Sequence, residues 1–130
     1  MRFLVSFLFG LLAEIATGLV IATGMVITHG GAMPSAPGAF PSWVPIVAIV
    51  AGSLFTFLIA SWRASRMRDR PVAHGLVVAL GAVVLHLATS LGGGQTLTAF
   101  HVVADLLKLV AGVAAGAAVR RRLGLSTGIA

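Results

Sequence analysis

Four long hydrophobic runs, separated by short polar or glycine-rich segments, dominate the sequence. Each run is long enough to cross the ~30 Å hydrocarbon core of a bilayer as an α-helix rising ~1.5 Å per residue. We therefore expect an all-α integral membrane protein, a four-helix transmembrane bundle built from two antiparallel hairpins. The expected single domain covers 1–122, followed by a flexible tail over 123–130. The predicted spans are 3–28, 43–62, 72–89 and 99–119.

The boundaries of these runs carry recognisable signals. Residues 29–42 are rich in Gly and Pro, and 90–98 contain three consecutive Gly, so both are expected to be irregular connections. Trp43 and Trp62 delimit the second span ~28 Å apart on a helix, the separation of the two aromatic belts of a bilayer. A basic residue before the first run is also the pattern of a secretory signal peptide, but we favour a span because the run is long and holds Glu14 at its centre.

The arginines are distributed unevenly along this pattern. The formal net charge of +6 would suit a nucleic-acid partner only if the basic residues formed a patch on a soluble surface. In a four-span arrangement the arginines instead fall on one side, which the positive-inside rule makes cytoplasmic. We expect a protein of the bacterial inner membrane whose two termini and Arg-rich loop (residues 63–71) lie in the cytoplasm. The expected partner is the lipid bilayer, and no nucleic acid is expected to bind. The arginines interpreted as topology or lipid-headgroup residues are Arg63, Arg66, Arg68, Arg70, Arg120, Arg121 and Arg122.

A polar stripe interrupts the last span. His101, Asp105 and Lys108 lie at i, i+4 and i+7, and therefore on one face of a helix. This face cannot point to lipid, because a charge at the bilayer centre costs ~2.5 to 3.5 kcal/mol on insertion scales. The first span holds Glu14 and the third holds His86, so the buried charges have possible partners on other helices.

Depth along the helices predicts which of these side chains meet. Measured from the Arg-rich side at ~1.5 Å per residue, Glu14 and Lys108 both lie ~16 Å deep. By the same estimate His86 and Asp105 lie ~21 Å deep, and His101 lies nearer the outer rim. We therefore predict that Lys108 bridges the two carboxylates and that His86 hydrogen-bonds Asp105 or a water beside it. Two carboxylates face one ammonium, so unless His86 is protonated we expect at least one carboxylate to have a raised pKa or to hold a proton or a cation.

Ionisable residues inside membrane spans are typical of proton relays and substrate sites. We therefore expect an ion- or proton-coupled transporter or channel unit, with Glu14 and Asp105 as proton or cation acceptors. Lys108 would be the counter-charge and His86 the relay. A bundle this small needs a homo-oligomer or a partner subunit to enclose a pathway. The alternative is a non-catalytic accessory or assembly subunit, in which the buried ion pairs fix which helices face one another.

Other chemistries have weaker support. No nucleophile with a base and an orienting group is visible, so an enzyme is not expected. The chain contains no Cys, which excludes disulfides and thiolate metal sites. Metal or haem binding is a minor alternative, because an i, i+4 His and Asp pair can hold one ion, but no cofactor is favoured. The candidate ligands are His29, His86, His101 and Asp105.

Small residues recur at helical spacing in every predicted span, which favours close helix packing. Ser53 and Thr56 are further expected to bond backbone or site groups. The packing stripes comprise Gly10, Glu14 and Gly18; Gly52, Thr56 and Ala60; Gly75, Ala79, Ala82 and His86; and Gly112 and Gly116.

The first span carries Leu12-Ala13-Glu14-Ile15 at its centre, and Gly94-Gln95 lies in the last predicted turn. In these features, and in having four spans in a short chain, the sequence resembles the small multidrug resistance transporters. The resemblance implies that Glu14 exchanges protons for cationic drugs. The sequence departs from that family in its charge asymmetry, its lack of Tyr and of a third-span Trp, its long first loop, and its added Asp105 and Lys108. Lys108 would compete with a cationic substrate for Glu14.

Overall fold

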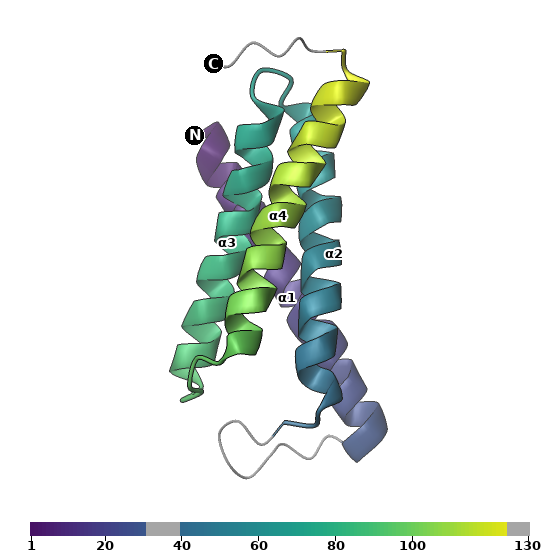
Figure 1. The fold of residues 1–130 in the computed structure, drawn as a ribbon, viewed down its shortest axis with the longest axis vertical. Helices are drawn as coiled ribbons and strands as arrows, with labels where there is room; N and C mark the ends of the chain where they lie inside the picture. The colour runs from purple at the N-terminus through teal and green to yellow at the C-terminus, as the bar shows by residue number, and fades with distance from the viewer. Residues whose placement is uncertain (31–39, 125–130) are drawn as a thin grey trace.

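The computed structural model describes residues 1–30 and 40–124. The expectations for most of the first connection and for nearly all of the tail therefore lie outside the described residues. The described chain forms four helices, and all four are long and apolar enough to cross a membrane. This confirms the all-helical fold with four candidate spans and indicates a membrane protein. The helices are α1 (Arg2–His29), α2 (Trp43–Arg66), α3 (Pro71–Gly92) and α4 (Ala99–Arg122) (Figure 1).

Local sequence explains where the helices begin and end. Pro71 occupies the first turn of α3, where its missing N–H costs no hydrogen bond. Gly30 ends α1 in the left-handed conformation, with φ of 59°, and its N–H donates to the Met25 carbonyl. Every helix extends past its predicted span, and α2 continues as far as Arg66. Mean hydropathy falls where the arginines begin, so the predicted spans stop there. The backbone nevertheless remains helical, because the aliphatic part of an arginine side chain can lie along apolar surface.

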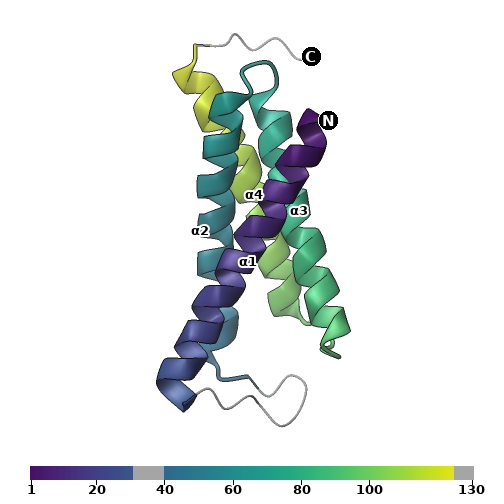
Figure 2. The same cartoon turned by 180° about the vertical axis from the view of Figure 1, so that it is seen from behind.

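Consecutive helices run antiparallel and pack as a four-cornered bundle (Figures 1 and 2). α1 and α4 each pack against α2 and α3, and α2 also meets α3 across the bundle. Within the described residues, the backbones of α1 and α4 do not meet, so these helices occupy opposite corners. We call one end the Arg-rich end; it holds Arg2, the 67–70 turn and residues 120–122. The other, where α1 and α3 finish, we call the open end.

Glycine allows the close helix crossings. A Cβ on Gly10 would overlap the Val78 carbonyl oxygen, and one on Gly75 would overlap the Gly112 carbonyl oxygen. Gly116 likewise packs on the backbone of Val72, where an added Cβ would lie 2.5 Å from the Val72 Cα. These contacts confirm the packing predicted for those stripes.

The bundle interior is built from small residues, and large hydrophobic side chains point outward. Ala60 and Ala79 are fully buried, whereas Leu12, Leu58 and Val110 are each more than half exposed or close to it, at 50%, 51% and 62%. In water such an outer surface would be unfavourable, but lipid is as apolar as Leu. The distribution therefore fits the membrane setting indicated by the lengths of the helices.

Candidate functional site

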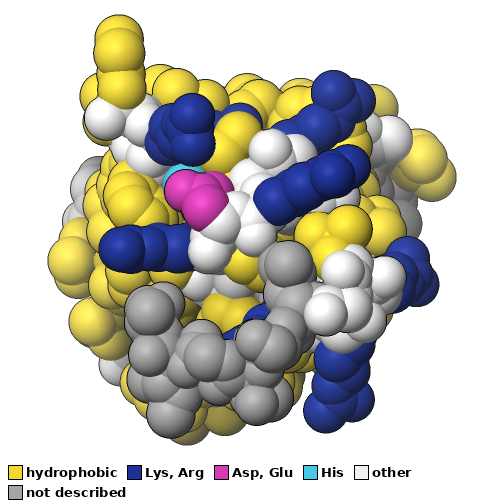
Figure 3. Space-filling model, turned by 90° about the horizontal axis from the view of Figure 1, so that it is seen from above, with side chains coloured by type: hydrophobic (Ala, Val, Ile, Leu, Met, Phe, Trp, Pro, Cys, Tyr) yellow, Lys and Arg dark blue, Asp and Glu magenta, His cyan; other side chains and the backbone are white. Residues whose placement is uncertain are grey.

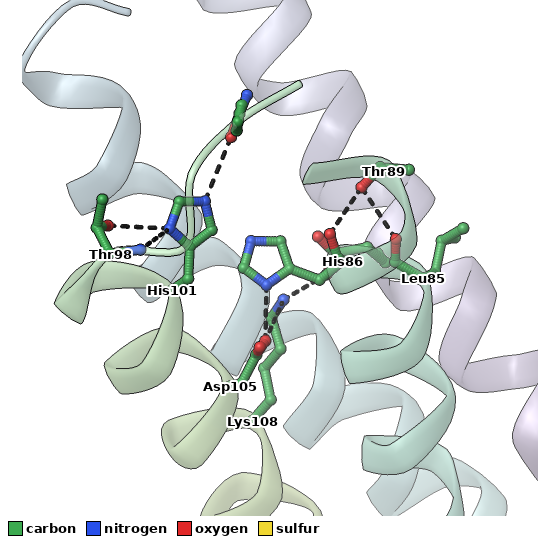
Figure 4. A network of polar contacts seen from close by, with 9 residues as sticks. Leu85, His86, Thr89, Thr98, His101, Asp105 and Lys108 are labelled. Atoms are coloured by element: carbon green, nitrogen blue, oxygen red, sulfur yellow. Dashed lines mark hydrogen bonds and ion pairs between the residues drawn. The ribbon is translucent and has the colours of Figure 1, made fainter. Parts of the chain in front are cut away.

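A network of four ionisable side chains lies inside the bundle, about halfway along it. Lys108 is 1% exposed. Its Nζ donates a hydrogen bond to Glu14 Oε2 at 2.7 Å and lies 3.7 Å from Asp105 Oδ1. His86 Nδ1 lies 2.6 Å from the same Asp105 oxygen (Figure 4). The contacts predicted from depth are therefore present, and we call Glu14, His86, Asp105 and Lys108 the central network.

Lys108 reaches Glu14 along a path that glycine provides. The two residues lie on α4 and α1, the helices at opposite corners of the bundle. The Lys108 side chain crosses the inner face of α2 at Gly52, where an added Cβ would lie only 2.9 Å from Lys108 Cε. Thr17 Oγ1 lines the same spot, 3.7 Å from that position. The sequence indicated Gly52 as a packing residue, but its neighbour is the lysine stem.

Hydrogen bonding orients the His86 ring. When Asp105 is ionised its carboxylate only accepts hydrogen bonds, so Nδ1–H of a neutral His86 ring then donates to Asp105 Oδ1. Nε2 is then the unprotonated ring nitrogen. Contact with the carboxylate at one ring nitrogen fixes the orientation of the ring and leaves the other nitrogen available.

His101 belongs to the rim of the network. Its Nδ1 accepts from the Thr98 backbone N–H at 3.1 Å and lies 2.9 Å from the Thr98 hydroxyl, which caps α4. Its Nε2–H faces Gln95 Oε1 at 3.3 Å. The ring also stacks on His86, with centroids 5.5 Å apart (Figure 4). A Thr followed three residues later by a side chain that can form hydrogen bonds is a pattern that could have predicted this helix cap from the sequence.

A cavity of about 520 Å³ leads to the network from the open end. Toward this end the α1–α2 pair diverges from the α3–α4 pair (Figures 1 and 2). Glu14 and His86 line the cavity, whereas Asp105 and Lys108 do not. Among the described residues that line the cavity, Glu14 alone is formally charged. The other lining residues are Gly18, Ile21, Phe40, Val44, Pro45, Ala48, Thr89, Ser90, Gly94, Gln95, Thr96, Thr98, Phe100, His101 and Ala104.

The cavity explains one departure from the predicted packing. Gly18 was expected to continue the small-residue stripe of α1, but a Cβ added there would meet nothing within 4 Å. The residue lines the cavity instead. This stretch of α1 therefore faces open space.

The four candidate metal ligands are not gathered into one site. Within residues 1–30 and 40–124, no group of three or more His, Asp or Glu side chains is placed to hold one ion. His29 ends α1 and is exposed, with its Nδ1 2.6 Å from the Thr28 hydroxyl. His101 uses Nδ1 for the helix cap. Among these four residues of the described chain, His86 and Asp105 are the pair joined by a hydrogen bond, at 2.6 Å.

A second polar cluster, which the sequence did not predict, lies near the Arg-rich end. Arg63 was expected in an exposed loop, but it lies within α2 and is 8% exposed. Its Nε donates to Ser6 Oγ at 3.0 Å and its Nη2 donates to the Arg2 carbonyl at 3.2 Å. Ser6 Oγ lies 2.7 Å from His74 Nδ1. These hydrogen bonds make burial of the guanidinium tolerable, and we call Ser6, Arg63 and His74 the Arg63 cluster.

Aromatic rings surround the Arg63 cluster. Phe3 stacks on the His74 ring at 4.4 Å, and the Arg63 guanidinium lies over the Phe9 ring at 5.7 Å. The predicted interface residue Trp62 is 48% exposed and meets Phe9 edge to face. The other one, Trp43, packs on Gly24 of α1. Ser6 and His74 occupy similar depths in the first and third spans, so depth matching was an available signal for this cluster too.

Several basic side chains lie on the surface of the Arg-rich end, beside an acidic side chain (Figure 3). Arg2 Nη1 lies 3.7 Å from Asp69 Oδ2, and both side chains are more than half exposed. The Arg66 guanidinium stacks over Trp62 at 5.5 Å. These contacts suit side chains at the boundary between an apolar and an aqueous phase.

Comparison with protein-family models, with curated proteins and with solved structures found no match for this chain. The likeness to the small multidrug resistance transporters therefore has no support beyond the residues that suggested it. The residues and their geometry carry the functional argument.

Proposed function

We propose that the chain is a small ion- or proton-coupled membrane transporter or channel unit, with Glu14 as the group that first receives the proton or cation. The observation that carries this proposal is the cavity from the open end, which reaches Glu14 directly. A carboxylate reached from outside and paired with a buried lysine at 2.7 Å can exchange its partner for a proton or a cation.

The charges of the central network support an uptake step. Two carboxylates and one ammonium leave one excess negative charge when His86 is neutral, and low dielectric makes that excess unfavourable. A proton on Glu14 removes its attraction for Lys108. The Lys108 ammonium can then move toward Asp105 Oδ1, which already lies 3.7 Å away. The network thus has two arrangements that differ in the partner of one lysine.

His86 supplies a second entry for the proton. Its Nε2 can accept a proton from the cavity, while Nδ1–H already donates to Asp105 at 2.6 Å. Protonation at one nitrogen and release at the other moves one positive charge from the cavity to the carboxylate. This step supports the relay role of His86 and makes Asp105 the inner acceptor.

The orientation in the membrane is part of the proposal. The positive-inside rule favours a cytoplasmic Arg-rich end, so the cavity would face the opposite side of a bacterial inner membrane. Between the central network and the Arg-rich end, the helices pack closely at Gly10, Gly75 and Gly112, which leaves little space for an ion to pass. Completing a pathway across the membrane would require a change in helix packing, a second copy of the chain, or a partner subunit.

Proton flux into liposomes that contain the purified protein tests this function. Under an imposed pH gradient the wild type is expected to conduct protons, and Glu14→Gln is expected to abolish the flux while the protein stays folded. Asp69→Asn is the matched control, because it removes the same charge from an exposed position at the Arg-rich end. Equal flux in wild type and Glu14→Gln would overturn the proposal.

A second candidate function is a non-catalytic accessory subunit of a larger membrane complex. The complete pairing of Lys108 favours it, because such pairs also hold helices in register. Co-purification of a membrane partner in fixed stoichiometry, combined with absence of flux from the isolated chain, would support this role over transport. A lone stable chain that conducts protons would exclude it.

A further inference from the structure

The hydrogen bonds of Ser6 can serve His74 in either of two protonation states. Arg63 Nε always donates to Ser6 Oγ, at 3.0 Å. When His74 Nδ1 is unprotonated, the Ser6 hydroxyl can donate to it at 2.7 Å. When Nδ1 carries a proton, it donates to Ser6, whose hydroxyl turns to the Arg2 carbonyl at 3.2 Å. Rotation of one hydroxyl therefore allows His74 to gain or lose a proton while the other atoms stay in place.

Two buried hydroxyls lie on α2 between the central network and the Arg63 cluster. Ser53 Oγ and Thr56 Oγ1 are inaccessible and have no hydrogen-bond partner among the described residues. The other threonines in the described helices donate to the carbonyl four residues back. Thr56 is 0% exposed and does not make that bond. An unsatisfied buried hydroxyl is costly, so its retention needs a reason.

The position of Thr56 supplies that reason. It follows Gly52, where Lys108 crosses α2, by one helical turn of ~5.4 Å. Arg63 follows Thr56 by two turns on the same face, ~10 Å further along the helix. The hydroxyl thus lies between the central network and the Arg63 cluster, on a helix that contacts both.

We propose that His74 is a second proton-binding site, and that Ser53 and Thr56 bind water molecules that link it to the central network. The inference rests on the proposed function and deepens it, because it gives the conducted proton a route toward the Arg-rich end. In this step a proton leaves the central network, passes along hydrogen bonds through the water, and binds the His74 ring. No other covalent bond forms or breaks. Release of the proton from His74 to the Arg-rich surface restores the neutral ring.

The charged groups that act on His74 are Arg63 from α2, Arg2 from α1 and Asp69 from the turn before α3. Arg63 and Arg2 oppose a second positive charge, whereas Asp69 favours it. Arg2 and Asp69 also pair with each other at 3.7 Å on the exposed surface. His74 therefore lies beside charged groups of the Arg-rich surface, which is the position expected of an exit site.

Thr56→Val tests the link, because valine keeps the shape of threonine and removes the hydroxyl. In liposomes under a pH gradient, Thr56→Val is expected to lower proton flux at least roughly tenfold relative to wild type. Thr56→Ser keeps the hydroxyl and is expected to keep most of the flux. Thr23→Val is the matched control, because that exposed hydroxyl donates to its own helix backbone at the Leu19 carbonyl and Thr23 does not line the cavity.

The outcomes separate this inference from the proposed function. A wild type without flux overturns the proposed function. A conducting wild type matched by Thr56→Val overturns only the link, and so does a Thr56→Ser variant that has lost its flux. A pH titration of the histidine ring signals by NMR provides the second measurement: His74 is expected to change protonation in folded protein, and a ring that stays in one state between about pH 5 and 8 overturns its assignment.

Discussion

Lys108 Nζ donates to Glu14 Oε2 at 2.7 Å although the helices that carry these residues stand at opposite corners of the bundle. The lysine stem spans the bundle interior and crosses α2 at Gly52. The ion pair therefore connects α1 to α4 where no backbone packing does. The ion pair therefore holds these two helices together, and a proton on Glu14 would break it.

Removing Lys108 should destabilise the fold strongly. Lys108→Met leaves two buried carboxylates without their cation, and loss of one partner of a buried pair costs roughly 3 to 5 kcal/mol. Thermal unfolding in detergent measures the loss. The double variant Lys108→Met with Glu14→Gln is expected to regain part of the stability, because it leaves one carboxylate fewer unpaired. A single variant as stable as wild type would contradict the assigned pairing.

Gly52 should be intolerant of even one methyl group. Gly52→Ala places a Cβ 2.9 Å from Lys108 Cε, so the lysine must move away from Glu14, at a cost of roughly 1 to 3 kcal/mol. Gly18→Ala is the control, because its Cβ meets nothing within 4 Å. Both variants add the same atoms to a helix of the same bundle. Equal unfolding temperatures for the two would show that Lys108 does not cross α2 at Gly52.

The crossing of α3 and α4 should depend on glycine for a different reason. Gly75→Ala and Gly112→Ala each force a Cβ against the facing helix backbone, which cannot move aside as a side chain can. We expect each to lower stability by at least about 1 to 3 kcal/mol. Gly92→Ala, where nothing lies within 4 Å, is expected to have little effect. Unfolding measurements in which all three behave alike would contradict the close approach.

The cap of α4 should contribute stability without affecting the ion pair. Thr98→Ala removes the side chain from a capping box with His101, and loss of such a cap costs ~1 kcal/mol. The Lys108 to Glu14 contact lies far along the bundle and should persist. The measurement is thermal unfolding together with proton flux, where lower stability with retained flux is expected. Complete loss of flux from the folded variant would instead show that Thr98 or His101 takes part directly in proton conduction.

Sequence reasoning located the helices and the central network for physical reasons. Hydrophobic runs mark spans because lipid tolerates few charges. The ends of α2 and α4 were placed too early because arginines continue these helices, as at Arg63, and α3 also runs on, to Gly92. Depth matching paired Lys108 with Glu14 because helix rise is constant and a buried charge needs a partner. Neither argument required knowledge of how the helices pack.

The remaining features depend on packing, which no pattern along one chain reveals. The path over Gly52 is visible only once α1 and α4 are known to stand apart. The cavity arises from divergence of two helix pairs (Figures 1 and 2). The Arg63 cluster was missed because Arg63 lies next to Trp62, at the expected membrane boundary, where an arginine ordinarily extends into water.

Blocking the cavity tests the central claim, that protons or ions reach Glu14 through it. The chain contains no Cys, so Ala48→Cys places a single thiol on the cavity wall. Ser65→Cys is the control, because Ser65 is exposed at the Arg-rich end. After reaction with a bulky membrane-impermeant thiol reagent, proton flux should stop in Ala48→Cys and continue in Ser65→Cys. Undiminished flux through fully modified Ala48→Cys would contradict the claim.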